Sequence, residues 1–425
     1  MEKLYFVDSI YDTNGEAGVD GDIYVNLICT YEEDGAYPTF YVKCKRTQLR
    51  FVADNGTVGI IEEGQYVYYE KIDEDNHRFR DGSNDPYALE QNNLGEELRQ
   101  SLNSKADVNG KGFLTPKERK ALRNGYVRSY HVNVGHGNCS LILIRGQRDI
   151  VLWMVDCSIV ERSGDEKKWK NHKSELERCL NNIRKASGKE KLHIDRFFLT
   201  HMHYDHYSGV NYLIDSGYLT KDTVYYINHY YECNSAPMNS FLKKLDGINA
   251  TLVEPVSGCS PSESIDIMHP EVRIYKKGKT DPNDKMAKRE AKDANNASVV
   301  YYFNIGNRTM MYPGDLDKEG FKIMFNHYGE FNINYYAISH HGSATGHPYD
   351  ISQLGIPKTY DHLLRKSSKA VLMGRDGSYN GIFDKLVLSY FDHYSALATT
   401  DMHRGLQPLA YLVLDWINSD ISYCY

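Results

Sequence analysis

The sequence has no closely spaced pair of cysteines. Its 8 cysteines are scattered along 425 residues, and none forms a CxxC pair. This spacing excludes a zinc ribbon, and a chain of this length is also unlike the short secreted chains in which disulfide frameworks occur. We therefore expect the cysteines to be buried free thiols.

Long apolar segments are also missing. No apolar run approaches the roughly 18 residues that a membrane-spanning helix needs. Residues 1–8 contain neither the apolar core nor the small-residue cleavage site of a signal peptide. We expect a cytoplasmic protein that does not interact with membranes.

An excess of positive charge is the third feature that the sequence lacks. The formal net charge is -7, which argues against a protein coated in basic surface for duplex DNA but leaves room for a locally basic cleft. Hydrophobic residues make up 41% and charged residues 25%, as is typical of globular chains. At about 100–200 residues per domain, two or three domains are expected.

The first 125 residues are predicted to form a β-rich accessory domain that ends in one or two helices. Short β-prone runs bounded by Gly, Asp and Asn extend to about residue 85, and a helix-like stretch covers residues 86–104. No motif in this segment identifies a ligand, so substrate recognition and binding of a protein partner both stay open as its role.

The segment Asp107–Glu118 supports two interpretations. Oxygen-bearing residues stand at positions one, three and twelve of a calcium-binding loop, but Lys111 at position five cannot ligate a cation. Alternatively, Thr115 caps a helix that begins at Pro116, and Glu118 is its reciprocal partner. We favour the cap, because it explains all three residues together.

From residue 126 onward, strands alternate with helices. Residues 130–134, 140–144 and 150–155 are apolar strand candidates, and Leu176, Cys179, Leu180 and Ile183 recur at the spacing of one helix face. This alternation predicts layered α and β structure for residues 126–425.

Four potential metal ligands follow directly after another apolar strand. They are His201, His203, Asp205 and His206, within six residues. In an extended segment, residues i and i+2 point the same way, so the first two histidines can reach one metal while the other pair diverges toward a second. Three histidines and an aspartate at this density predict a metal site.

At these residues the chain resembles the metallo-β-lactamase superfamily, whose signature is HxHxDH after a strand. Asp156 matches the aspartate that ends an early strand, Asp315 the aspartate that bridges two metals, and His340 or His341 the late histidine. The resemblance implies an αββα four-layer sandwich that binds two divalent metal ions, Zn or Mn. It implies as metal ligands His201, His203, Asp205, His206, Asp315 and one of His340 and His341, with Asp156 in a structural role near the site.

The chain is further similar to the metallo-β-lactamase domain of the ComEC competence family, over roughly residues 127–410. The matching motifs are Asn133–Asn138, Asn295–Val300, His340–Ser343 and Thr400–Gly405. ComEC also has a membrane channel, which this chain lacks, so a soluble stand-alone relative is the nearer analogue. Because asparagine stands where many superfamily members have a third histidine, we expect a His201/His203 site with fewer ligands than the second site.

The expected chemistry is metal-dependent hydrolysis. Two metals sharing Asp315 would ionise a water near neutral pH, and the hydroxide would attack phosphorus or a carbonyl. Asp205 belongs to this catalytic centre. The leaving group needs an acid, for which we consider the non-ligating member of the His340–His341 pair and His403; an exposed loop position is the alternative for His403.

Basic segments favour a phosphodiester substrate, such as single-stranded nucleic acid or a nucleotide. Residues 166–173 contain four Lys against one Glu (4 - 1 = +3), and residues 275–292 contain six Lys and one Arg against three acids (7 - 3 = +4). Solvated loop charge is the alternative. Other esters (a lactone, thioester, sulfate or phosphocholine) and a non-enzymatic sensor also stay open. The substrate-contact candidates are Asn296, Ser298, Ser343, Lys167, Lys168, Thr400 and Asp401.

Overall fold

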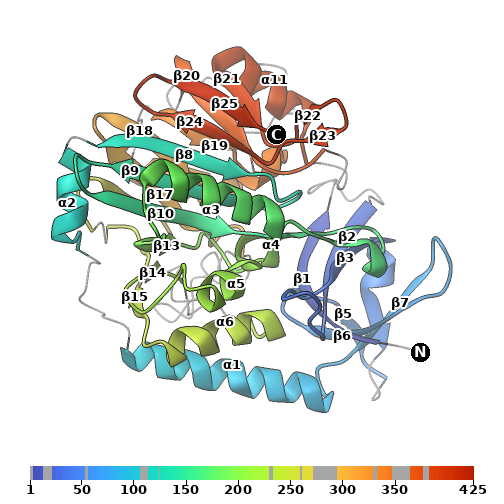
Figure 1. The fold of residues 1–425 in the computed structure, drawn as a ribbon. Helices are drawn as coiled ribbons and strands as arrows, with labels where there is room; N and C mark the ends of the chain where they lie inside the picture. Colours follow the sequence, from blue (N-terminus) through green and yellow to red (C-terminus); the bar gives the residue numbers. More distant parts are fainter. Residues whose placement is uncertain are drawn as a thin grey trace.

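Two large β-sheets form the body of the molecule from residue 126 onward (Figure 1). The structure is a computed structural model. It describes residues 3–12, 22–52, 56–105, 113–123, 125–228, 233–258, 261–270, 294–328, 333–346, 364–376 and 382–425. No helix in these ranges is both long and apolar enough to cross a bilayer.

The first sheet has the strand order β15-β14-β13-β10-β9-β8-β24-β25. Its strands are β8 (Tyr126–Val132), β9 (Cys139–Arg145), β10 (Ile150–Cys157), β13 (Arg196–Phe198), β14 (Val224–Tyr226), β15 (Thr251–Val253), β24 (Tyr411–Asp415) and β25 (Asp420–Cys424). Strands β10, β13, β14 and β15 run parallel, so their carboxyl ends meet at one edge.

The second sheet has the order β16-β17-β18-β19-β20-β21. Its strands are β16 (Ile265–His269), β17 (Val300–Ile305), β18 (Arg308–Tyr312), β19 (Ile333–Ala337), β20 (Leu364–Leu372) and β21 (Ala396–Thr399). Strands β18 to β21 are parallel, and the loops after β18 and β19 carry the late motifs of the sequence.

The two sheets pack face to face through aromatic side chains. Trp153 and Phe198 of the first sheet meet Phe303 of the second, with ring centroids 5.7 and 5.1 Å apart. Successive strand residues point to opposite faces, so each sheet also has an apolar outer face. Helices α3 (Lys173–Ser187), α5 (Val210–Asp215) and α6 (Ala236–Gly247) cover the first sheet, and α9 (Lys318–Tyr328) and α11 (Lys385–Tyr394) cover the second.

The helix face predicted from sequence periodicity is confirmed in α3. Leu176, Cys179, Leu180 and Ile183 are all completely buried against the outer face of the first sheet. The helix ends at its C-cap residue Gly188, which adopts a left-handed conformation with φ of 65°.

The N-terminal region is β-rich, as predicted. Its sheet has the order β3-β2-β1-β6-β7, built from β1 (Lys3–Asp12), β2 (Asp22–Cys29), β3 (Thr39–Lys45), β6 (Tyr66–Lys71) and β7 (His77–Asp81). A hairpin of β4 (Arg50–Val52) and β5 (Val58–Ile60) follows the short helix η1 (Arg46–Leu49). We call residues 3–81 the N-terminal module; it lies beside the two large sheets (Figure 1).

Two helices connect the N-terminal module to the large sheets and pack against them. Helix α1 (Pro86–Lys105) lies along α6, where Asn239 donates a hydrogen bond to the carbonyl of Gln91 at 2.8 Å (Figure 1). Helix α2 (Pro116–Arg123) contacts β9 and β10. Both helices therefore bury surface against the body that begins at residue 126.

The predicted capping box at the start of α2 is confirmed. The backbone N–H of Glu118 donates to Thr115 Oγ1 at 3.2 Å, and the N–H of Thr115 donates to Glu118 Oε2 at 2.7 Å. The same buried carboxylate accepts hydrogen bonds from Arg196 and Trp153. The carboxylate that a calcium loop requires at position twelve is thus engaged internally, and residues 106–112 lie outside the described ranges.

Replacing Glu118 with Gln should destabilise the fold strongly. Gln keeps an acceptor for the cap but leaves the Arg196 guanidinium, which is fully buried, without its counter-charge. Removing one partner of a buried ion pair costs about 3–5 kcal/mol, and urea denaturation should show a loss of this order. Glu97→Gln on the exposed face of α1 is the matched control and should leave the midpoint nearly unchanged. Equal midpoints for both variants would contradict this role of Glu118.

Candidate metal centre

The histidine-rich motif lies at the carboxyl end of β13, where the chain leaves the sheet. The strand is fully buried, the chain bends at Met202 and His203, and His203 itself has extended φ and ψ of -78° and 144°. His201 Nε2 and His203 Nδ1 are 3.1 Å apart, so the two imidazoles converge as the i, i+2 spacing predicts. The short helix α4 (Tyr204–Tyr207) then carries Asp205 and His206.

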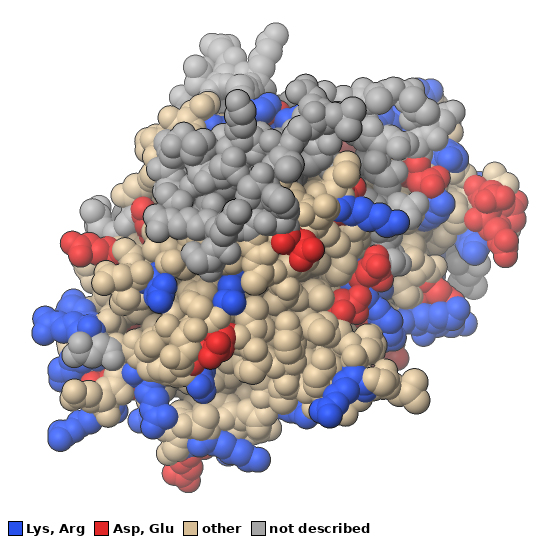
Figure 2. All heavy atoms as spheres, turned by 90° about the horizontal axis from the view of Figure 1, so that it is seen from above, with Lys and Arg blue, Asp and Glu red and all other residues tan. Residues whose placement is uncertain are grey.

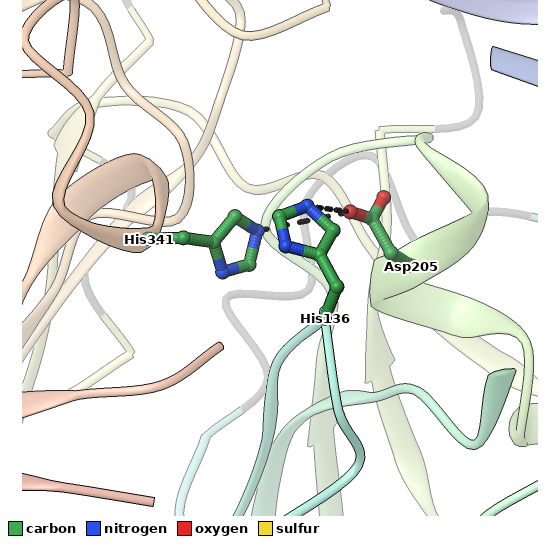
Figure 3. A group of neighbouring side chains, drawn as sticks. All are labelled: His136, Asp205 and His341. Carbon is green, nitrogen blue, oxygen red and sulfur yellow. Dashed lines mark ion pairs between the residues drawn. The ribbon is translucent and has the colours of Figure 1, made fainter. Parts of the chain in front are cut away.

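The potential ligand atoms form two buried groups. One contains His201, His206 and Asp315, and the other contains His136, Asp205 and His341; within each group the ligand atoms lie within 4.8 Å of one another. Figure 3 shows the second group, in which His136 and His341 face the Asp205 carboxylate from different elements. Asp205 Oδ2 is 3.4 Å from His136 Nε2 and 3.7 Å from His341 Nε2.

The carboxylate of Asp315 joins the two groups. Its Oδ1 lies 3.3 Å from His206 Nε2, and its Oδ2 lies 3.6 Å from His341 Nε2. Asp315 follows β18 after Gly314, which has a φ of 60° and where a Cβ would lie 2.6 Å from the side chain of Thr200. The glycine therefore permits the close approach that brings this carboxylate between the histidines.

Several polar atoms of these groups are buried without a hydrogen-bond partner in the described part of the chain. They are His203 Nε2, His206 Nε2, His341 Nε2 and Asp315 Oδ1. An unpaired buried polar atom costs about 1–3 kcal/mol, so four such atoms gathered at one place indicate a site that a ligand can complete. Imidazole nitrogens and carboxylate oxygens together suit a divalent ion such as Zn or Mn, and the residues therefore fit a metal centre.

Two residues behind the ligands fix the orientation of the imidazoles. Asp156, at the end of β10, accepts hydrogen bonds from Thr200 N at 2.8 Å and Thr200 Oγ1 at 2.9 Å, and lies 2.8 Å from His206 Nδ1. His341 Nδ1 lies 3.0 Å from the carbonyl of Met373. These contacts leave Nε2 of both histidines facing Asp315, an arrangement typical of metal-binding histidines.

Electrostatic interactions couple the Asp315 carboxylate to the histidines around it. Burial would raise the pKa of Asp315, but His206, His341 and His340 outweigh it and hold the pKa well below its usual range. Burial lowers the pKa of His201, because it disfavours the charged imidazolium, and His206 lowers this pKa further. At neutral pH this carboxylate is therefore ionised and His201 is neutral, the states in which both bind metals.

Comparison with known proteins agrees with this geometry. The sequence model of the Metallo-beta-lactamase superfamily matches residues 132–372, more than half of the chain. The chain belongs to this superfamily. The matched region contains both ligand groups, and a search of curated proteins finds no relative that matches. Metal-dependent hydrolysis is the activity that membership of the metallo-beta-lactamase superfamily suggests.

The structure divides the ligands differently from the predicted metallo-beta-lactamase pattern. We expected a His201/His203 site and a second site of Asp205, His206, Asp315 and a late histidine, but His206 groups with His201. The reason is the contact with Asp156, which turns His206 Nε2 toward Asp315, while Arg162 contacts the Asp205 carboxylate at 3.2 Å.

The adjacent late histidines have different surroundings. His341 joins the ligand group, whereas His340 Nδ1 lies 3.2 Å from Asp317 and its Nε2 is 4.0 Å from Asp315. Both lie in the loop η3 (Ser339–Gly342) and adopt positive φ angles, 48° and 51°, and their ring planes are inclined at 69° to each other. The geometry favours His341 as the ligand and leaves His340 at the edge of the centre.

Not every predicted site residue reaches the ligand groups. His403 lies on β22 (His403–Arg404), is 53% exposed, and its nearest charged partner among the described residues is Asp401 at 3.8 Å. Asp401 also accepts a hydrogen bond from the backbone of Asp376. Thr400 is buried, and its hydroxyl accepts from the N–H of Gly374, which packs behind His341. The structure thus places Thr400 in a supporting position.

The remaining substrate-contact candidates belong to neither ligand group. The amide oxygen of Asn296 accepts from the N–H of Gly320 at 3.3 Å, and Ser343 Oγ is 2.9 Å from Tyr11 Oη. Ser298 is completely buried, and its Oγ has no hydrogen-bond partner in the described ranges. Lys167 and Lys168 are exposed on η2 (Glu166–Lys168).

Sequence reasoning missed His136. It lies in the turn Gly135–Gly137, whose glycines have φ of 68° and 144°; a Cβ at Gly137 would lie 2.7 Å from the carbonyl of Asp205. The glycines on both sides of His136 are the sequence feature that could have identified it, because they allow the turn to approach the Asp205 backbone closely. Arg162 and the carboxylates Asp8 and Glu63 were also missed, and no local pattern marks them.

The purified protein should bind one to two equivalents of Zn²⁺ or Mn²⁺ per chain. Asp315→Asn should lose at least one equivalent, because that carboxylate faces both ligand groups. Asp266→Asn on β16 makes the same chemical change in the same sheet and should bind like the parent. Elemental analysis after metal loading and desalting measures both. Parent protein that binds no metal on titration would contradict the site.

Proposed function

We propose that the chain is a metal-dependent phosphodiesterase, a nuclease or nucleotide hydrolase, related to the soluble ComEC-like group. The observation that carries the proposal is the pair of buried His/Asp groups joined by Asp315. The order of helices, sheet, sheet and helices supports the assignment of an αββα four-layer sandwich.

The ligand groups define what each residue contributes. His201, His206 and Asp315 would hold one ion, with His203 beside them, and His136, Asp205 and His341 would hold the other. When bound, such ions lower the pKa of a coordinated water to near neutral and neutralise charge on the transferred group. The buried carboxylates would position the ions, and the surrounding buried apolar strands would limit access of bulk water.

His340 is the candidate proton donor for the leaving group. It lies beside the ligand groups without joining either, and Asp317 orients its ring through Nδ1. A general acid needs this placement, because it must reach the departing oxygen without being blocked by a metal. His403, the other candidate from the sequence, is far more exposed.

A local basic loop supports a phosphate-containing substrate. Lys167, Lys168 and Lys170 are exposed on the loop that follows β11 (Val160–Glu161), next to Arg162 at the centre. Figure 2 shows one face of the molecule, on which Lys and Arg occur in small groups with Asp and Glu between them. A net charge of -7 combined with a local basic loop suits a single strand or a nucleotide better than a long duplex. The second basic segment, 275–292, lies outside the described residues.

The double variant Asp205→Ala/His206→Ala should abolish hydrolysis of bis-p-nitrophenyl phosphate. It removes one ligand from each group. Because such ligands act as a unit, removing either one alone should reduce activity nearly as much as removing both. The matched control, Asp73→Ala/His77→Ala in the β6–β7 hairpin, should hydrolyse the substrate at the parent rate. Turnover by the double variant at the parent rate would place the chemistry elsewhere.

Neutralising the basic loop should weaken binding of nucleic acid selectively. Changing the four lysines to Gln should raise KM for single-stranded DNA, flatten its salt dependence and reduce kcat less than kcat/KM. A small neutral ester should be unaffected, because it offers no phosphate charge. The four are Lys167, Lys168, Lys170 and Lys173.

The matched control changes four exposed lysines at the opposite end of the parallel strands, before β13 and β14, and should behave as the parent does. These are Lys185, Lys189, Lys191 and Lys221. Equal loss on DNA and ester for the loop variant would indicate a structural role. An unchanged KM for DNA would remove the support that this loop gives to a phosphodiester substrate.

A further inference from the structure

A carboxylate of the N-terminal module reaches the metal centre. Asp8, on β1, is only 4% exposed, and Arg162 Nη2 donates a hydrogen bond to its Oδ2. The same guanidinium contacts both oxygens of Asp205, from Nη1 to Oδ2 at 3.2 Å and from Nη2 to Oδ1 at 3.3 Å. One buried arginine is thus shared between a residue of the module and a candidate metal ligand.

Asp8 also supports the short helix that carries two ligands. Both of its oxygens lie 3.2 Å from the backbone N–H of Tyr204, the first residue of α4. The first N–H groups of a helix need acceptors from outside it, and the N-cap residue His203 provides no side-chain cap. Asp8 therefore takes the place of a cap for the segment that bears Asp205 and His206.

The charges of this cluster explain why a second carboxylate is required. Two aspartates and one arginine are buried together, so the formal sum is one negative charge. If Asp8 were neutral, Arg162 would pair with Asp205 alone, and this ligand would offer a cation much less charge.

We propose that Asp8 is a positioning residue of the metal centre, acting through Arg162 and the Tyr204 amide on the ligand Asp205. The proposal rests on the metal-dependent function inferred above. Two further contacts of the module occur at the same place: Glu63 Oε2 lies 3.9 Å from His203 Nε2, and the ring of Tyr11 packs edge-on against His340. The N-terminal module is accordingly part of the site.

The test measures metal affinity in the full-length chain. Asp8→Asn keeps an oxygen for the Tyr204 amide and removes the charge that Arg162 requires. Competition with a chromogenic chelator should show Zn²⁺ binding weakened by about 10–100-fold, the usual effect of changing a residue that orients a metal ligand. The control Asp22→Asn makes the same change on β2 of the module, where Asp22 pairs with Lys43 at the surface, and should bind like the parent.

Thermal unfolding separates positioning from simple stability. The rise in Tm caused by Zn²⁺ should shrink in Asp8→Asn, since this rise reports binding to the folded state. Arg162→Lys, which keeps the charge but loses the two-pronged contact, should behave similarly.

Parent-like affinity in both variants, or a lower Tm in EDTA with an intact metal-induced rise, would overturn the role of Asp8. A parent protein that binds neither Zn²⁺ nor Mn²⁺ would instead refute the proposed function itself.

Discussion

The carboxylate of Asp315 lies where the two buried groups of candidate ligands meet, and the site depends on this arrangement. Polar atoms at this depth carry a desolvation cost that the hydrogen bonds of the described chain do not fully offset. A divalent cation between them would compensate that cost. The two sheets, by contrast, are held by ordinary aromatic and aliphatic packing, which makes the strand ends rigid supports for the ligands.

Patterns of short range predicted local features of the fold and the approach of two histidines. The i, i+2 spacing of His201 and His203 predicted convergent imidazoles, and the Thr115–Glu118 spacing predicted the cap, because in each case the interacting residues are neighbours in the sequence. Likewise, the periodicity of α3 predicted which face is buried. These features depend only on local backbone geometry.

Long-range contacts could not be predicted in this way. Asp8 is 154 positions from Arg162 and 196 positions from Tyr204, so only the folded chain brings them together. The division of ligands between the two groups depends on such contacts as well, since Asp156 turns His206 from 50 positions away. A single sequence contains no periodic signal for these pairs.

The N-terminal module connects with the basic loop as well as with the ligands. Ser163 O accepts the backbone N–H of Tyr41 at 2.9 Å, and Glu166 accepts hydrogen bonds from Lys3 and Tyr5. The loop that carries the exposed lysines thus contacts the module, and Arg162 just before it contacts Asp205 at the metal centre. The N-terminal module therefore contacts both the arginine that supports Asp205 and the loop whose lysines are proposed to bind phosphate.

The most direct measurement is anomalous X-ray diffraction at the zinc edge from crystals grown with Zn²⁺. The account predicts two anomalous peaks about 3.5–4 Å apart on either side of the Asp315 carboxylate. One should lie against His201 and His206, and the other against Asp205 and His341. Saturating zinc that gives no peak within bonding distance of Asp315 would contradict the account.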